Sequence, residues 1–259
     1  MTETHTLANL LTWYPTPSYL VKRRAILDVL ARISARSVLE VGCGAGDLLR
    51  ELGKRGYTGR GIDLSAEAVA TARLKVNPSC FFVEQTELGE IDEQFEVVIA
   101  SEVLEHCLDD VAFLLGLRER IVEGGHLLLT VPAHMAKWGD NDELCGHVRR
   151  YERDQLWQIL EQAGFKPLLI YSYGVPIYNL MKPFYDHAVA GKIREEEVIE
   201  ERTAKSGGMK LLPGGEILFG LLFNDFTMFL FYLLQRCFYR TDLGNGYLAV
   251  ALNSATRGS

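Results

Sequence analysis

Four residues near the start of the chain have the types and the spacing of a cofactor-binding turn. Glu40, Gly42, Gly44 and Gly46 stand at every second position after a short apolar segment. Glycines let the backbone approach a ligand closely, and the start of the next helix leaves N–H groups free. The carboxylate at the end of the strand can accept hydrogen bonds from an ammonium group. This pattern predicts a site for a nucleotide-like cofactor that carries positive charge.

The spacing also argues against a dinucleotide. A dinucleotide fingerprint would have its third glycine at position 47, where this chain has Asp47. The third glycine comes one residue earlier, at Gly46, and the carboxylate of Asp47 is a poor neighbour for a pyrophosphate. A nicotinamide-dependent reductase is therefore the less favoured alternative.

The glycine run, followed by Gly61-Ile62-Asp63-Leu64-Ser65, closely resembles the class I S-adenosylmethionine-dependent methyltransferases. The resemblance implies S-adenosylmethionine as cofactor and S-adenosylhomocysteine as product. It also implies that the glycines lie against the methionine part of the cofactor and that Asp63 holds the ribose hydroxyls. The cofactor-binding residues implied in this way are Glu40, Gly42, Cys43, Gly44, Gly46, Asp63, Leu64, Ser101 and Glu102.

Residues 133–151 form a long polar segment after the fifth apolar strand. Ligands of open parallel sheets lie beyond the carboxyl ends of the strands, so this segment is placed for acceptor chemistry. A histidine has a suitable pKa to remove a proton from an attacking hydroxyl. The candidate catalytic residues are His134, His147 and Tyr151. The run Gly146–Tyr151 resembles a pattern found in a subset of these methyltransferases.

Other interpretations of this region remain open. Arg149 or Arg150 would hold an acceptor that carries phosphate or carboxylate, or Arg149 and Tyr151 would pin the segment to the next helix. His106, after the fourth strand, has either a structural or a proton-transfer role. The histidines and aspartates of the segment show no regular metal-ligand spacing, so we predict no metal site; they are His134, Asp140, Asp142 and His147.

Apolar segments alternate with helical patterns from residue 37 to residue 171, which is typical of a doubly wound sheet. We predict an α/β, Rossmann-like fold with seven mostly parallel strands, an antiparallel last strand, and a helical insertion between strands six and seven. Ser18, Ser65 and Asp109 are expected to cap helices. The predicted units are an N-terminal helical cap (1–34), the α/β core (35–173), the insertion (174–243), and the last strand with the tail (244–259).

The insertion contains a predicted charged helix, Lys192–Lys205, and an apolar run, Ile217–Leu234, that is long enough to cross a bilayer. A single span is not expected, because strands six and seven pair in one sheet. Asp225 within the run would also add about 2.5 to 3.5 kcal/mol to insertion. The run is therefore a lid over an apolar acceptor pocket, a peripheral membrane contact, a helix buried on the core, or a homodimer contact.

Composition narrows the class of protein. The chain has 259 residues and a formal charge of −7, so no basic field favours nucleic acid. Its five cysteines are odd in number and scattered, which argues against a disulfide framework. No secretory signal is visible, and a cytoplasmic location is expected.

The preferred function is methyl transfer to the oxygen or nitrogen of a small-molecule or lipid-linked acceptor. No Asn/Asp-Pro-Pro-Tyr/Phe motif of base or glutamine methylation occurs in the chain. The alternative from another class is a regulatory module that binds S-adenosylmethionine without catalysis.

Overall fold

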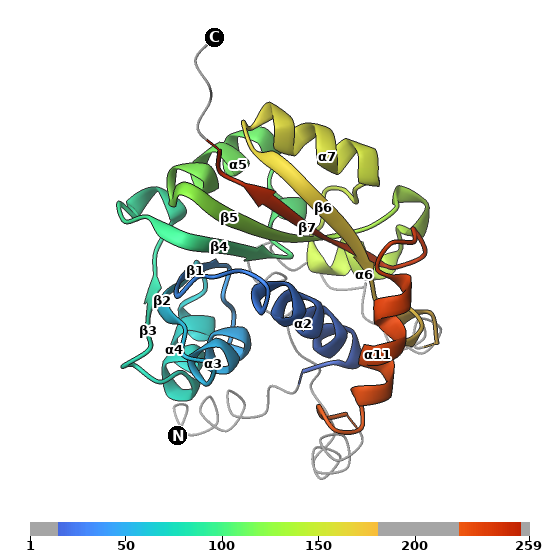
Figure 1. Ribbon diagram of the computed structural model, residues 1–259, viewed down its shortest axis with the longest axis horizontal. Coiled ribbons are helices and arrows are strands. Elements are labelled where there is room, and N and C mark those ends of the chain that lie inside the picture. Colours follow the sequence, from blue (N-terminus) through green and yellow to red (C-terminus); the bar gives the residue numbers. More distant parts are fainter. Residues whose placement is uncertain (1–14, 181–222, 255–259) are drawn as a thin grey trace.

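The computed structural model describes residues 15–180 and 223–254 (Figure 1). Their central feature is a seven-stranded sheet with the strand order β3-β2-β1-β4-β5-β7-β6. From β3 to β5 the neighbouring strands run parallel, whereas β7 is antiparallel to both β5 and β6. This confirms the predicted fold class. The strands are β1 (Ser37–Val41), β2 (Thr58–Asp63), β3 (Phe81–Gln85), β4 (Phe95–Ser101), β5 (Ile121–Pro132), β6 (Lys166–Tyr173) and β7 (Gly246–Leu252).

Helices cover both faces of the sheet (Figure 1). One face carries α2 (Pro17–Leu30), α3 (Asp47–Gly53), α4 (Ala66–Lys75) and α11 (Phe229–Phe238). The other carries α5 (Asp110–Glu119) and α7 (Arg153–Gln162). Shorter elements in the connections are η1 (Leu88–Glu90), η2 (Leu104–His106), η3 (Met135–Lys137) and α6 (Asp140–Cys145).

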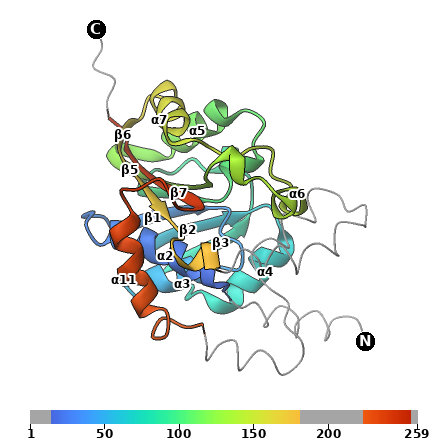
Figure 2. The ribbon, with the colours of Figure 1, turned by 90° about the vertical axis from the view of Figure 1, so that its right-hand side faces the viewer.

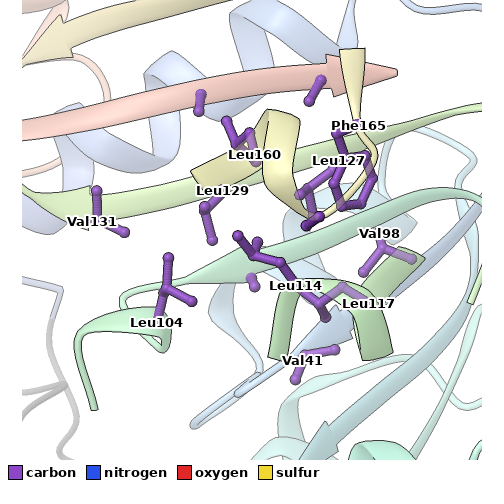
Figure 3. Packing of buried hydrophobic residues seen from close by; sticks show 14 of the residues in the cluster. Val41, Val98, Leu104, Leu114, Leu117, Leu127, Leu129, Val131, Leu160 and Phe165 are labelled. Carbon is purple, nitrogen blue, oxygen red and sulfur yellow. The ribbon is translucent and has the colours of Figure 1, made fainter. Parts of the chain in front are cut away.

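The central strands are apolar on both faces because both faces are covered. Successive side chains of a strand point to opposite faces, so β4 sends Val98 to one helical layer and Ile99 to the other. Figure 3 shows Val98 and Leu127 beside Leu114 of α5 and Leu160 of α7. Because helices cover both faces of the sheet, a ligand has access at the carboxyl ends of the strands.

Helix starts follow the sequence signals at two of three places. The side chains of Ser65 and Asp109 cap α4 and α5, as predicted. The prediction for Ser18 is wrong: Thr16 caps α2, and its Oγ1 accepts a hydrogen bond from the Tyr19 amide at 3.2 Å. The physical reason is Pro17, which lacks an N–H and is suited to the first turn of a helix.

The predicted charged helix Lys192–Lys205 lies outside the described residues. The described part of the apolar run turns at residues 223–228 and then forms α11, which packs beside α2 (Figure 2). Met228 and Tyr232 contact Leu20 and Val21 there. Across residues 15–180 and 223–254, the longest apolar helix falls short of what a membrane crossing requires.

Candidate active site

The glycine turn lies between β1 and α3, where the strand order reverses between β1 and β4. This is the position at which open α/β sheets bind ligands. A Cβ at Gly42 would lie 2.6 Å from Cγ2 of Val103, and one at Gly46 would lie 2.8 Å from Cβ of Ala72. A Cβ at Gly44 would meet nothing within 4 Å. Two glycines thus allow close packing, and the third leaves open space.

The carboxylate of Glu40 is a buried polar group beside this turn that could bind a ligand. The residue is only 4% exposed, and its Oε2 has no hydrogen-bond partner among the described residues. Burial, and then the charges of Asp47 and Asp63, raise its pKa well above the ordinary value, against a smaller lowering by Lys22. A cation bound here would give Oε2 a partner and would lower the pKa of Glu40.

Asp63 ends β2 beside the same turn. Its Oδ2 accepts a hydrogen bond from the Gly44 amide at 2.8 Å, and its Oδ1 accepts one from the Ser65 amide at 2.9 Å. Each carboxylate oxygen has a second lone pair, which remains for a ligand hydroxyl. The adjacent Leu64 is 70% exposed, so an apolar surface stands next to that carboxylate.

Arg23 joins the first helix to this turn and to the insertion. Its guanidinium lies 2.6 Å from the carboxylate of Asp47 and 2.9 Å from that of Asp225. Arg23 and Asp47 are nearly fully buried, whereas the Asp225 side chain is 64% exposed. Asp47 therefore organises the start of α3 instead of facing a phosphate, and Asp225 is paired in a way that the sequence did not indicate.

The end of β4 brings Glu102 to the same edge. Glu102 has a φ of 57°, and its Oε1 accepts a hydrogen bond from the Tyr173 hydroxyl at 2.7 Å. Burial opposes its ionisation, but Lys22 and the Tyr173 hydroxyl outweigh that effect and lower its pKa. Ser101, one residue earlier, shares a hydrogen bond of 3.0 Å with Thr130. A charged carboxylate is thus held in a constrained conformation beside the glycine turn.

Segment 133–151 is more ordered than the predicted loop, since it contains η3 and α6. Backbone hydrogen bonds close it at its base, from the His134 amide to the Tyr151 carbonyl and from the Tyr151 amide to the Pro132 carbonyl. Both ring nitrogens of His134 are engaged: Nδ1 lies 3.1 Å from Glu152, and Nε2 lies 2.9 Å from the Asp242 carbonyl. These contacts place His134 at the base of the segment.

The two arginines of the segment contact protein groups. Arg149 pairs with Asp110 at 2.8 Å and also donates to the Leu108 carbonyl. Arg150 is buried and lies 2.8 Å from Asp142. Tyr151 is fully buried. The side-chain hydrogen bonds of Arg149 and Tyr151 are structural, but they run to Asp110 at the start of α5 and to the Leu108 and Leu104 carbonyls, and not to the next helix, α7, as the structural interpretation expected.

Three groups from two segments that are far apart in the sequence lie together near the end of β4. Glu105, His106 and His147 each offer a potential ligand atom, and these atoms lie within 4.8 Å of one another. Nδ1 of His147 lies 2.8 Å from the Asp142 carboxylate. Spacing along the chain could not reveal this cluster, because it forms only when the segment after β5 folds back over the end of β4. His147 thus lies beside Glu105 and His106, two neighbours that the sequence did not indicate, and its role toward an acceptor stays a prediction.

Comparisons with known proteins agree with this geometry. A family model described as "Methyltransferase domain" matches residues 19–170. A protein named ubiquinone biosynthesis O-methyltransferase, from Pseudomonas syringae pv. tomato, is 32% identical over 110 residues, which are 40% of this chain and 47% of that protein. The chain thus matches about half the length of this curated relative.

Solved structures share the fold at low identity. An S-adenosylmethionine-dependent methyltransferase from Mesorhizobium loti is 14% identical with a TM-score of 0.53, over 88% of this chain and 97% of that one. Magnesium protoporphyrin IX methyltransferase from Synechocystis, solved with bound S-adenosylhomocysteine, is 19% identical with a TM-score of 0.50, over 60% and 75%. On the family match, which spans most of the core, the chain belongs to the class I S-adenosylmethionine-dependent methyltransferases.

Proposed function

We propose that the protein transfers the methyl group of S-adenosylmethionine to an oxygen or nitrogen of a small-molecule or lipid-linked acceptor. The observation that carries this proposal is the buried, unpartnered carboxylate of Glu40 beside the open space at Gly44. The ammonium group of an amino-acid ligand is the natural partner for such a carboxylate. Asp63, with spare lone pairs, would take the ribose hydroxyls.

The cofactor, when bound, would supply a sulfonium methyl group whose carbon a nucleophile attacks, with S-adenosylhomocysteine as the leaving group. The chain's own part is to orient: Glu40 and Asp63 would fix the two ends of the ligand, with Gly42, Cys43, Gly44, Gly46 and Leu64 along it. Ser101 and Glu102 would face the reacting end. Holding the two reactants in line supplies much of the rate of such a reaction.

Among the candidate catalytic residues, we assign different roles. His147 would face the acceptor, because it lies with Glu105 and His106 near the end of β4. His134 and Tyr151 would position the segment through the contacts at its base. An acceptor hydroxyl would then lose its proton near His147 and not near His134.

The acceptor class follows from two features. The curated relative is named for O-methylation in ubiquinone biosynthesis, so a hydroxyl on a lipid-soluble ring is the first acceptor to test. Leu108 and Val148 are 84% and 43% exposed beside the residues of the cluster, and an apolar acceptor would cover them. We propose that the insertion, residues 174–243, completes this acceptor side, and that the protein works in the cytoplasm with its cysteines free.

Calorimetry tests the donor site. We expect S-adenosylmethionine to bind and NAD to give no heat. Glu40→Gln should weaken S-adenosylmethionine binding at least tenfold, whereas Glu67→Gln, on the exposed side of α4, should leave it unchanged. Tight NAD binding without S-adenosylmethionine binding would instead identify a reductase.

A methyl-transfer assay tests the acceptor. Labelled donor is incubated with a catechol that carries an apolar tail, with the same catechol without the tail, and with a primary amine. Turnover of the tailed catechol supports the proposal. Donor binding with no turnover on any acceptor, including extracted lipids, would favour the regulatory module.

A further inference from the structure

The cluster of Glu105, His106 and His147 has the composition of a metal site. Two imidazoles and one carboxylate come from η2 and from the segment after β5, and one ligand atom of each lies within 4.8 Å of the others. Nε2 of His147 is 3.8 Å from Oε1 of Glu105. Ligands bonded at about 2.0 to 2.2 Å to one tetrahedral ion lie about 3.3 to 3.6 Å apart, so small side-chain rotations would close the site.

Glu105 is a buried carboxylate that lacks a partner. It is 0% exposed, and neither of its side-chain oxygens has a hydrogen-bond partner among the described residues. A buried carboxylate without compensation is costly, and such groups are usually paired or bound to metal. The nearest cationic candidate is the His147 ring, which is not within hydrogen-bond distance of it. Both carboxylate oxygens of Glu105 therefore have lone pairs that a bound cation could use.

His147 is oriented as a metal ligand usually is. Its Nδ1 lies 2.8 Å from Oδ1 of Asp142, a carboxylate that also receives hydrogen bonds from Arg150 and from the Gly139 amide. The Asp142 carboxylate accepts from Arg150, so Nδ1 of His147 is the ring nitrogen that donates to it, and Nε2 is the nitrogen left to bind an ion on the side of Glu105. Carboxylates of this kind fix the tautomer and the orientation of metal-bound histidines.

His106 is fixed by a similar contact. Its Nδ1 lies 3.2 Å from the carbonyl oxygen of Gly146, which can only accept a hydrogen bond. The proton is thus on Nδ1, and the second ring nitrogen keeps its lone pair. The rings of His106 and His147 meet edge to face with centroids 5.0 Å apart. Two imidazole rings therefore stand beside the unpaired carboxylate.

We propose that Glu105, His106 and His147 bind a divalent transition-metal ion of the Zn²⁺ type, with Asp142 as a positioning residue. Two nitrogens and one oxygen suit Zn²⁺ or Co²⁺ better than Mg²⁺, which prefers oxygen ligands. Three protein ligands leave a coordination position open for water or substrate. The absence of regular ligand spacing in the sequence is no obstacle, since the ligands come from two separate segments.

The role of the ion rests on the proposed function. The cluster adjoins the donor site, because Val103, two residues before Glu105, packs against Gly42. An acceptor hydroxyl bound to the ion would lose its proton to solvent more easily. Its oxygen would then form a bond to the methyl carbon while the carbon–sulfur bond breaks and the electron pair returns to sulfur.

Metal binding is measured on untagged, chelator-treated protein without donor or acceptor. Zn²⁺ calorimetry and the visible absorption of Co²⁺ should both report one ion per chain. We expect Glu105→Gln and His147→Ala to weaken Zn²⁺ binding at least a hundredfold, and Asp142→Asn about tenfold to a hundredfold. His126→Ala, which removes a histidine of β5 outside the cluster, is the matched control and should bind as the wild type does.

Circular dichroism and S-adenosylmethionine binding check that each variant is folded. Glu105→Gln keeps the shape of the side chain and is the variant to rely on if His147→Ala unfolds. Wild-type protein that binds neither Zn²⁺ nor Co²⁺, or a folded Glu105→Gln that binds Zn²⁺ as tightly as the wild type, would overturn the metal site. Because no methyl acceptor is present, these outcomes are distinct from failure of the proposed methyl transfer.

Discussion

At the scale of single residues, we expect Glu40 to set which ligand charge the proposed donor site accepts. Its carboxylate is buried next to Asp47 and Asp63, and the chain provides no hydrogen bond to Oε2 among the described residues. Protonation and cation binding therefore compete for the same oxygen atoms. This competition makes cofactor affinity depend on pH.

We predict that the affinity for S-adenosylmethionine falls as the pH is lowered. Burial and the neighbouring charges of Asp47 and Asp63 raise the pKa of Glu40, so the carboxylate gains its proton at a higher pH than an ordinary glutamate does. Protonated Glu40 cannot form an ion pair with the ammonium group of S-adenosylmethionine. The Kd of S-adenosylmethionine should therefore rise as the pH falls through the raised pKa of Glu40. Calorimetry between about pH 5 and pH 8 measures this. In Glu40→Gln the weaker binding should vary much less with pH, and an unchanged slope would contradict this role.

The sequence indicated which residues lie together at the glycine turn, but it did not indicate which residues lie together near the end of β4. Glu40, the glycines and Asp63 lie within one strand–turn–helix unit and the next strand, so their order along the chain gives their placement. Glu105, His106 and His147 are joined by tertiary folding, and no spacing rule connects them. The donor assignment remains a prediction at the level of individual residues, and the cluster of Glu105, His106 and His147 became visible only in three dimensions.

At the scale of elements, Arg23 connects α2, α3 and the insertion through one guanidinium. We predict that Arg23→Met lowers the free energy of unfolding by about 3 kcal/mol, because it leaves the buried Asp47 with Arg50 as its remaining ion-pair partner among the described residues. Asp225→Asn should cost less than about 1 kcal/mol, because the Asp225 side chain is 64% exposed. Urea denaturation of both variants gives the comparison. Equal losses would mean that the contact to the insertion matters as much as the buried pair.

Element boundaries were predictable where local chemistry sets them. Ser65 and Asp109 cap their helices because each side chain can reach an amide three residues ahead. At α2, two neighbouring candidates competed, and the proline between them favoured Thr16 over Ser18. In segment 133–151, the polar run concealed α6, whose first turn is held by a hydrogen bond from the Gly139 amide to Asp142. Polar composition alone does not distinguish such a short helix from a loop.

At the scale of the whole molecule, α11 has two distinct faces. Met228, Tyr232 and Gln235 are buried against the rest of the protein. The opposite stripe is apolar and exposed, from 42% to 90%, and consists of Phe226, Phe229, Leu230, Leu233 and Leu234. The predicted apolar run therefore contains both a buried face and an exposed one.

We expect this exposed stripe to contact a lipid surface. Leu230→Glu combined with Leu234→Glu should reduce co-sedimentation with neutral phospholipid vesicles at least tenfold, because each change removes an exposed apolar side chain and adds a charge. Leu74→Glu, at a similarly exposed position of α4, is the matched control and should have no effect. If the wild-type protein does not co-sediment with vesicles but forms a concentration-dependent dimer in sedimentation velocity, the stripe is instead a contact with a second copy of the chain.

The overall fold was predictable because an alternating series of apolar strands and amphipathic helices allows few topologies. The insertion was located by the long gap before the last strand. Its internal packing on α2 was not predictable, because an apolar run looks alike whether one or both of its faces are covered.

The insertion leaves and re-enters the sheet at neighbouring points. Tyr173 and Gly246 pair across β6 and β7, and the Asn245 amide donates to the Tyr173 carbonyl at 3.0 Å. Both ends of the segment between them therefore lie at the same end of the neighbouring strands β6 and β7. We expect that this segment could be exchanged without changing any strand of the sheet, provided that its replacement also covers the apolar side of α2 and pairs with Arg23. With the insertion completing the acceptor side, as proposed above, such an exchange would alter acceptor choice and leave the proposed donor residues in place.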